Sequence, residues 1–441
     1  MRRNIFARRL ACGALLVQLA AAGASAQTVG ESRTRIHDPE AEAAQKLLAE
    51  AQAAIDQKDF VTAAQRYQAY IAKKPGDAYA HFQLGYAYTA MQRPRDAKPE
   101  YAKAAELDPK MGPAYVNLGM TLLDLGETSA AVAPLQKAAE LTPADAHARF
   151  LVGVVLERSG NLPAAVEQYQ AAEKLDDKNV EIHTALGRAL LASNHPSDAE
   201  SEFRAALSLQ ADSAQAHLGL ARSLIAEKKS DAAAAELAAY LKSRPNDSAA
   251  RLERASLLVD TGKYQDAISE LDAASAGKPE DLHVLTLRAQ ADLAMKNYDA
   301  AIPVLQKVAA LAPRDPQFPA ALGHAYLEKK DYPHALQSLA AAFKMNSQSN
   351  DVLGELIAAE YYTNNYQAAL QALDLLSQRQ PLSLGNWFTR ATCFDKLGEA
   401  PQALDAYQKF LQLNKDENSD MYFVAAARVR TLQRELKEHK R

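Results

Sequence analysis

The sequence predicts an all-α chain built from helix pairs that repeat along most of its length. Ala is abundant, while Gly and Pro, which interrupt helices, contribute only 18 and 19 of the 441 residues. Rows of 34 residues that start at Ala44 follow one another eleven times, up to Glu417, without an insertion or a deletion. The chain is too long for one compact core, so we expect a stack of such repeats.

The clearest mark of the repeat is the twentieth position of each row, here called column 20. It holds Ala in all eleven rows, as Ala63, Ala97, Ala131, Ala165, Ala199, Ala233, Ala267, Ala301, Ala335, Ala369 and Ala403. Column 8 holds Gly85, Gly119, Gly153, Gly187 and Gly323, and mostly Ala elsewhere. Small residues in both columns predict two helices that pack closely against each other.

The two halves of a row each have the spacing of an amphipathic helix. In the third row, Tyr115, Leu118, Gly119 and Leu122 fall in columns 4, 7, 8 and 11, which share one helix face. Columns 20, 24 and 27 repeat this spacing and predict the second helix. Each row is therefore expected to form a helix, a turn and a second helix.

Column 15 predicts the turn, because it is rich in residue types that tolerate the left-handed conformation. It holds Gly126, Gly160, Gly262, Gly398, Asn194 and Asn364. Two or three residues later stand Pro94, Pro163, Pro196, Pro333 and Pro401, where proline suits the start of a helix. Proline in column 32 of seven rows then ends the pair.

Residues 1–26 predict a cleaved export signal of the bacterial type. Four arginines precede an apolar run, Leu10 to Ala22, that is too short to span a bilayer, and Ala24-Ser25-Ala26 resembles a signal-peptidase site. The position of Cys12 does not fit a lipoprotein signal. The mature chain would start at Gln27 and be periplasmic or secreted. We expect no integral membrane segment in it, and no intrachain disulfide, because Cys393 would be its one thiol.

The charge argues against a nucleic-acid partner. The whole chain has 50 basic and 54 acidic residues, a net charge of −4, and loss of the four signal arginines would leave a mature chain of −8. Neutralising phosphates needs a net basic face. We therefore expect no nucleic-acid binding.

The ends of the repeat region are expected to be capped. Residues 27–43 should form a leader and the start of the first helix at Asp38-Pro39-Glu40. The repeats occupy residues 44–417, and residues 418–441 predict a C-terminal capping helix that begins near Asp420. Its expected apolar side holds Met421, Val424, Leu432 and Leu436, and its basic residues, such as Arg428, would face water.

From Ala44 to Glu417 the pattern resembles the tetratricopeptide repeat family. The second row shows it best, with Leu84, Gly85, Tyr88, Ala97, Tyr101, Ala104 and Pro109 at the family's spacings. The resemblance implies a right-handed superhelical α-solenoid of about eleven 34-residue helix-turn-helix repeats with a C-terminal capping helix. It also implies that the first helices line a concave groove through columns 2, 5, 9, 12 and 13.

These groove columns contain apolar and aromatic residues that could bind a partner. They are Tyr79, Phe82 and Tyr86 in row two, Val116, Met120 and Leu123 in row three, and Phe150 and Val154 in row four, with a smaller group of Tyr361, Tyr362 and Phe388. The alternative is that columns 5 and 9 touch the neighbouring first helix and are half-buried. Trp387 falls in column 4 and is expected in the core.

Two arginines, Arg188 and Arg222, share column 9 in consecutive rows. They could clamp an acidic side chain or a C-terminal carboxylate of a partner. The alternative is that Glu157 and Glu181 neutralise them as ordinary surface ion pairs.

The sequence has no catalytic or metal-binding motif. It lacks a Gly-rich phosphate loop, Gly-x-Ser-x-Gly, His-Glu-x-x-His and Cys-x-x-Cys. His183 and His217 share column 4 and are expected to be interface residues without a metal. Cys393 has no evident activating base. We therefore expect no enzyme activity, no cofactor and no metal site.

The leading hypothesis is an exported scaffold that binds a peptide or helix of a partner protein in its groove. Exported bacterial proteins of similar sequence commonly serve envelope, pilus or polysaccharide-export assembly, which is an analogy with the family. The alternative is an architectural spacer or self-associating subunit whose groove holds no ligand. An enzyme with an unrecognised site ranks last.

Overall fold

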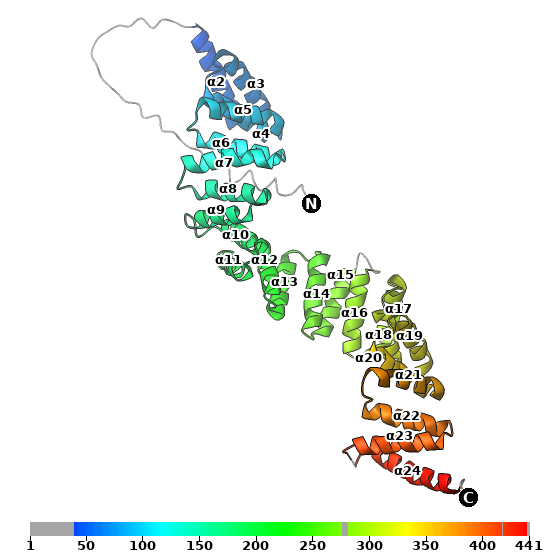
Figure 1. Cartoon of the computed structure of the whole chain (residues 1–441). Coiled ribbons are helices and arrows are strands. Elements are labelled where there is room, and N and C mark those ends of the chain that lie inside the picture. The colour runs from blue at the N-terminus through cyan, green and yellow to red at the C-terminus, as the bar shows by residue number, and fades with distance from the viewer. Residues whose placement is uncertain (1–38, 276–280, 417, 439–441) are drawn as a thin grey trace. The chain divides into compact units, whose positions relative to one another are not determined.

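A computed structural model describes residues 39–275, 281–416 and 418–438, and these residues form helices and short connections without a strand. The predicted signal and most of the leader lie outside the described residues. The described residues divide into two compact units, the first ending at Leu107 and the second beginning at Asp108. Each unit consists of antiparallel helix pairs (Figure 1), which confirms the predicted all-α solenoid of helix-turn-helix repeats.

Each predicted row corresponds to one pair of helices. In the first unit the first helices are α2 (Pro39–Asp56) and α4 (Ala78–Ala90), and the second helices are α3 (Phe60–Lys73) and α5 (Pro94–Leu107). In the second unit the first helices are α6 (Gly112–Asp124), α8 (Ala146–Arg158), α10 (Val180–Ala192), α12 (Ala214–Ala226), α14 (Ser248–Asp260), α16 (Leu282–Ala294), α18 (Gln317–Glu328), α20 (Asn350–Tyr362) and α22 (Leu384–Lys396). Their partners are α7 (Thr128–Leu141), α9 (Leu162–Glu173), α11 (Pro196–Leu209), α13 (Ser230–Ser243), α15 (Tyr264–Ser275), α17 (Tyr298–Leu311), α19 (Tyr332–Met345), α21 (Tyr366–Arg379) and α23 (Ala400–Leu413).

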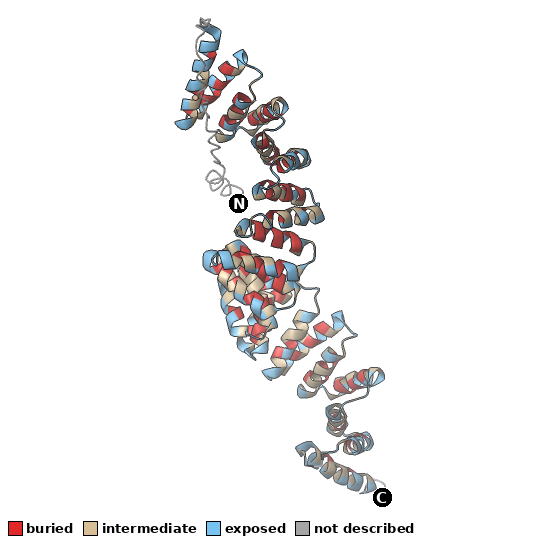
Figure 2. Ribbon diagram, turned by 90° about the vertical axis from the view of Figure 1, so that its left-hand side faces the viewer, coloured by how far each residue is buried: buried red, intermediate tan, exposed pale blue. Residues whose placement is uncertain are grey.

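The two helices of a pair meet at the predicted small residues. The alanines of column 20 have no exposed surface in any of the eleven repeats. Opposite them, a Cβ built on Gly153 would lie 2.5 Å from the ring of Tyr169, and one built on Gly119 would lie 2.4 Å from Leu135. The large residue of column 24 therefore occupies the space that a side chain in column 8 would need. Buried residues accordingly follow the facing sides of the helices within each unit (Figure 2).

The turn inside each pair uses a left-handed residue at column 15. Gly126, Gly160, Gly262 and Gly398 have φ between 75° and 83°, and Asn194 has φ 63°. The same position is also left-handed where the residue type did not predict it, in Lys58, Gln92, Lys228, Lys296 and Lys330. After each such residue, the next N–H donates to a carbonyl of the first helix, as from Lys229 to Leu224 at 2.8 Å, which satisfies an otherwise unpaired helix end.

Neighbouring pairs in the second unit share their core. One apolar cluster runs from Leu122 in α6 to Ala267 in α15. Inside it the ring of Phe203 lies between two glycines, Gly187 of its own repeat and Gly219 of the next, because a Cβ on either would come within 3.0 Å of the ring. Beyond this cluster the repeats are joined by smaller ones, such as the cluster of Leu353, Leu373 and Cys393.

The terminal helices differ in part from the predictions. Helix α2 begins at Pro39 as predicted, and α24 (Asp420–Glu438) is the predicted last helix. Leu432 is buried, but Met421 and Val424 are 42% and 49% exposed, so their expected place on the apolar side is wrong. Ala425 is buried and Val429 packs on the same cluster, which sets the packed face of the helix. Arg428 is half-buried, and it donates to both carboxylate oxygens of Asp395 on α22, at 2.7 and 2.5 Å, so it pairs within the chain as well as facing water.

We predict that Gly153→Ala lowers the free energy of unfolding by about 1–3 kcal/mol, the usual cost of overpacking a core. The ring of Tyr169 cannot swing away, because its hydroxyl donates to Glu157 at 2.7 Å. Gly354→Ala in α20 is the matched control, since no atom lies within 4 Å of its Cβ position. It should stabilise the chain by about 0.5–1 kcal/mol, because Ala loses less backbone entropy in a helix. Urea-induced unfolding followed by circular dichroism checks both, and equal effects would contradict the close approach.

We also predict that Lys296→Gly raises the free energy of unfolding by about 0.5–1 kcal/mol. Lys296 has φ 58°, a conformation that costs a residue with a Cβ roughly 1–2 kcal/mol. Glycine avoids this cost but loses more backbone entropy on folding, which offsets a part of the gain. Gly262→Ala, at the same position of the preceding repeat, should lower stability instead. The two urea midpoints should therefore move in opposite directions. Shifts of the same sign would mean that the turns tolerate either backbone conformation.

Candidate partner-binding surface

The strongest exposed aromatic group of the first unit lies on α4. Tyr79 is 48% exposed and Tyr86 is 37% exposed, while Phe82 between them is half-buried. The ring of Phe82 packs on Tyr101 at 5.8 Å, and the edge of Tyr86 meets Phe60 at 6.1 Å. The half-buried ring of Phe82 is thus held against Tyr101, with a tyrosine on either side that is open to solvent.

The predicted apolar residues of the second unit are more buried. Val116, Met120 and Val154 are half-buried and pack against the large core cluster. Phe150 is only 8% exposed and packs on Tyr169 at 5.7 Å, and Leu123 is also buried. The structure therefore corrects the placement of Phe150 in the groove. Its ring faces the partner helix of its own repeat, which leaves little of it exposed.

Arg188 is already paired. Its Nε and Nη2 donate to Glu157 on α8 at 2.8 and 2.9 Å, and Tyr169 donates to the same carboxylate. Burial alone would raise the pKa of Glu157, but the hydrogen bonds from Arg188 and Tyr169 outweigh it and lower the pKa. Hydrogen bonding to Glu157 in turn raises the pKa of Arg188. The ion-pair alternative therefore holds for Arg188, with Glu157 as its partner.

Arg222 differs from Arg188, so the two arginines do not act alike. It is exposed, and no carboxylate within the described ranges lies at ion-pair distance from it. The pKa of Asp247 is lowered chiefly by the hydrogen bond that the Tyr240 hydroxyl donates to it, and more weakly by the charge of Arg222. Arg222 is the guanidinium of the pair that remains available to a partner.

A tyrosine cluster lies near the C-terminal end of α20. Tyr362 is 53% exposed and stacks on Tyr332 at 4.5 Å, while Tyr361 lies edge-on to Tyr362 and Tyr366. The sequence predicted Tyr361 and Tyr362 but not Tyr332 and Tyr366. Column 17 carried the missing signal, because it holds Tyr264, Tyr298, Tyr332 and Tyr366 in four consecutive rows.

The aromatic residues of the last repeat have mixed roles. Phe388 is half-buried and packs on Tyr407 and Phe410, so it belongs mainly to the core. Trp387 was expected in the core but is half-buried, and it lines a cavity of about 330 Å³ with Phe394 and Asp405. The guanidinium of Arg390 lies 5.9 Å from the Trp387 ring centre and also pairs with Asp374.

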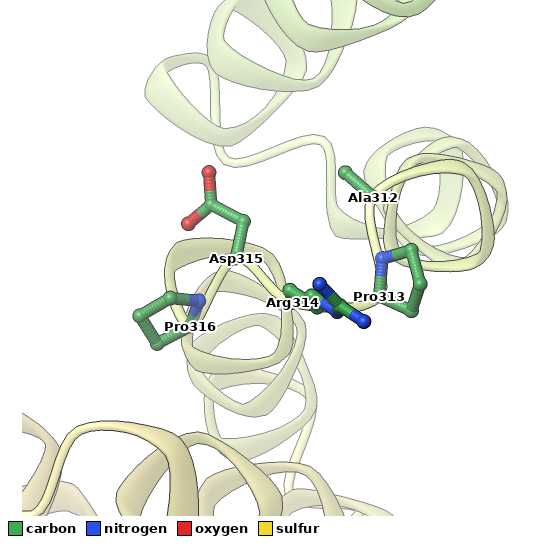
Figure 3. A pocket seen from close by; sticks show the side chains of 5 residues that line it. All are labelled: Ala312, Pro313, Arg314, Asp315 and Pro316. Atoms are coloured by element: carbon green, nitrogen blue, oxygen red, sulfur yellow. The ribbon is translucent and has the colours of Figure 1, made fainter.

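The hollow beside the loop between α17 and α18 is not a candidate binding site. Its lining consists of five consecutive residues, Ala312 to Pro316 (Figure 3). The carboxylate of Asp315 accepts the backbone N–H of Gln317 at 2.9 Å and so caps the next helix. The hollow follows from the shape of a loop.

The Cys393 thiol and the cluster around His183 contain residue types that could react or bind a metal, but their surroundings already bury or occupy them. Burial raises the pKa of the Cys393 thiol to about 11, so it stays protonated and is a poor nucleophile. Glu173, His183 and Glu202 bring three possible metal ligands within 4.8 Å of one another. The His183 ring, however, has Nδ1 at 2.7 Å from Glu202 and Nε2 at 3.0 Å from the carbonyl oxygen of Asp177. Both nitrogens already face acceptors of the chain, so a metal at this cluster would have to displace one of these contacts.

None of the helices in the described ranges is both long and apolar enough to cross a bilayer.

Comparison with known proteins identifies the repeat. Two family models, both described as tetratricopeptide repeat, match this chain, one at residues 48–112, 82–146, 116–180, 184–248 and 320–383 and the other at 224–291 and 258–325. No curated protein matches the chain.

Solved structures share the fold at low identity. MamA from Desulfovibrio magneticus is 20% identical (TM-score 0.37) over 40% of this chain and 98% of its own. YrrB, a TPR protein with an unusual peptide-binding site, is 20% identical (0.39) over 42% and 96%. Yeast Tom70 is 13% identical (0.31) over 90% and 97%. At these TM-scores none of the likenesses indicates a partner for this chain.

The family models match well over half of the chain, and the matches of each model are spaced by 34 residues or multiples of 34, like the rows and the helix pairs. The protein therefore belongs to the tetratricopeptide repeat family and is a scaffold for protein–protein interaction.

Proposed function

We propose that the protein binds an extended peptide or an amphipathic helix of a partner protein, with Tyr79 and Tyr86 as the anchor. The observation that carries this proposal is the exposure of both tyrosines beside the fixed ring of Phe82. Tyrosine is enriched among residues that dominate binding energy, because it buries a large area at a small entropic cost. The packing of the repeat does not account for the exposure of these two rings.

The spacing of the anchor suits a regular partner. Tyr79 and Tyr86 are seven residues apart on one helix, which separates them by about 10 Å along its axis. That distance matches apolar side chains at i and i+7 of a partner helix, or about three residues of an extended peptide. The exposed charge of Arg222 and the tyrosine cluster of Tyr332 and Tyr362 give the second unit separate contact points of their own.

We also propose that the protein is exported from the cytoplasm. The order of basic residues, short apolar run and Ala24-Ser25-Ala26 supports cleavage after Ala26 and a place in the periplasm or outside the cell. In that compartment a scaffold of this kind would serve envelope, pilus or polysaccharide-export assembly.

One observation favours the alternative of a self-associating subunit. At the start of α24, Met421, Phe423 and Val424 are 42%, 59% and 49% exposed. Such an apolar group on the last helix of a repeat array could pack on a second copy. In that case the exposed residues of α4 would carry no ligand.

We predict that a photo-crosslinking amino acid placed at position 79 or 86 of the full chain captures a specific partner protein in cells of its natural host. The captured segment, made as a synthetic peptide, should bind the purified protein, and Tyr79→Ser with Tyr86→Ser should weaken its Kd at least about tenfold, since two exposed anchors are lost. The same probe at position 423 is the matched control and should not capture this partner.

Other outcomes of that experiment separate the hypotheses. An adduct of twice the chain's mass from position 423, with none from 79 or 86, would favour self-association. A peptide that binds the double variant as tightly as the wild type would contradict the anchor assignment. The double variant should keep its helical circular dichroism, because both side chains are exposed.

We predict that the chain isolated from a bacterial host begins at Gln27, because signal peptidase cleaves after the small-x-small sequence. N-terminal sequencing of the purified protein checks this. Replacing Ala24 and Ala26 by bulky residues should leave the precursor uncleaved. A native chain that still starts at Met1 and stays inside the cell would contradict export.

A further inference from the structure

Three histidines, two of them buried and the third half-buried, occupy the same position of their repeats and make the same pair of contacts. They are His81 on α4, His183 on α10 and His217 on α12, all in column 4. Their Nδ1 atoms lie 2.6, 2.7 and 2.6 Å from carboxylate oxygens of Glu100, Glu202 and Glu236, each on the second helix of the same repeat. Their Nε2 atoms lie 3.2, 3.0 and 3.0 Å from the backbone carbonyls of Pro75, Asp177 and Ala211, each in the turn before the repeat.

This geometry suits a protonated ring. A neutral imidazole has one N–H, so its other nitrogen would direct a lone pair at an oxygen that is also an acceptor. A doubly protonated ring donates to both oxygens at once. With an ionised glutamate opposite Nδ1, the complete contact therefore requires the charged form of the ring.

The next repeat carries a permanent version of the same contact. Arg251 stands in column 4 of α14, its Nε donates to the carbonyl of Pro245 at 3.0 Å, and its Nη1 donates to Glu270 at 2.7 Å. A guanidinium cannot lose its proton in this setting. Arg251 thus makes, with a permanent cation, the same two contacts that His183 makes with a ring whose charge depends on pH.

The contact at His183 is reinforced by a second carboxylate. Glu202 on α11 and Glu173 on α9, whose Oε1 is 3.7 Å from Nδ1, both face the ring. No carboxylate of α8 or α12, the other described helices that pack on α10, lies at ion-pair distance from it. Burial would lower the pKa of His183, but the hydrogen bonds to Glu202 and Asp177 and the two nearby carboxylates outweigh it and raise the pKa.

The same contact lies at a joint that lacks the usual proline. Asp177 and Ala211 stand in column 32, where seven rows have proline, and their carbonyls are the ones that His183 and His217 hold. Because the carbonyl belongs to the turn of one repeat and the histidine to the next, each contact ties the two repeats together. A joint without a rigid proline depends more on such a tie.

We propose that His183 is a pH-dependent clip that fastens α9 and the turn after it to α10 and α11 when its ring is protonated, and that loosens when the ring becomes neutral. His81 and His217 repeat its two contacts with a single carboxylate each. The direction of the pH dependence follows from the linkage between protonation and folding. A raised pKa in the folded state means that the stabilisation is fully present below the unfolded value of about 6.5 and is lost as the pH rises through the folded pKa.

The test compares the wild type with His183→Arg and His183→Gln in the full chain. Urea midpoints are measured between about pH 5.5 and about pH 8.5, across the range in which histidine titrates. We expect the wild-type midpoint to fall as the pH rises and that of His183→Arg, which copies Arg251, to fall less. His183→Gln should start lower at acid pH and also show less pH dependence. His283→Gln is the matched control, an exposed histidine on α16 that should keep the wild-type slope.

A direct measurement of the protonation of the His183 ring distinguishes a pH-dependent clip from a purely structural contact. Selective ¹⁵N labelling of histidine, with the His183 signals assigned by their loss in His183→Gln, should show a ring whose pKa lies above the ordinary value of about 6.5. A ring that titrates below pH 6.5, or equal midpoint slopes in the wild type and His183→Arg, would overturn the clip. So would stabilisation of the wild type, but not of His183→Gln, by added Zn²⁺, because a metal needs the lone pair that the clip uses for a proton.

Discussion

The close approach of two helices within each repeat governs the rest of the structure. It requires a residue with little or no side chain on both faces of the contact, which is why the column 20 alanines are fully buried and why a Cβ at Gly119 or Gly153 would collide with the partner helix. A large residue in column 24 then fills the seam. With the spacing inside each pair fixed, the pairs can stack in register, and the faces that the stack does not use are left for a partner.

A second consequence is that neighbouring repeats share apolar clusters. In the second unit the apolar core is continuous from α6 to α15, and Phe203 is enclosed by glycines of two successive repeats. Ionic contacts add to this core at the joints, such as Arg188 with Glu157, the His183 clip and Lys263 with Asp231 at 2.9 Å. From α16 onwards smaller clusters link the repeats in sequence. The stability of each repeat therefore depends on its neighbours.

The sequence was most informative where one physical demand recurs in every repeat. The column 20 alanines, the column 8 glycines and the glycine turns could be predicted because the backbone allows few alternatives. The exposure of single residues could not, since the ring of Phe150 turns towards Tyr169 of the partner helix and the row pattern does not fix that orientation. Met421 and Val424 were misplaced because α24 occurs once, so no second copy fixes its rotation. The histidine contacts were foreshadowed by Glu100, Glu202 and Glu236, nineteen residues after each histidine.

Native-state hydrogen exchange of the full chain, measured by peptide mass spectrometry, tests the central claim most directly. If neighbouring repeats stabilise one another through a shared core, the second unit should protect the amides of α8 to α13 most strongly, with protection that declines through the smaller clusters towards α24. Equal protection of all repeats, or strongly protected repeats separated by unprotected ones within α6 to α15, would contradict the account.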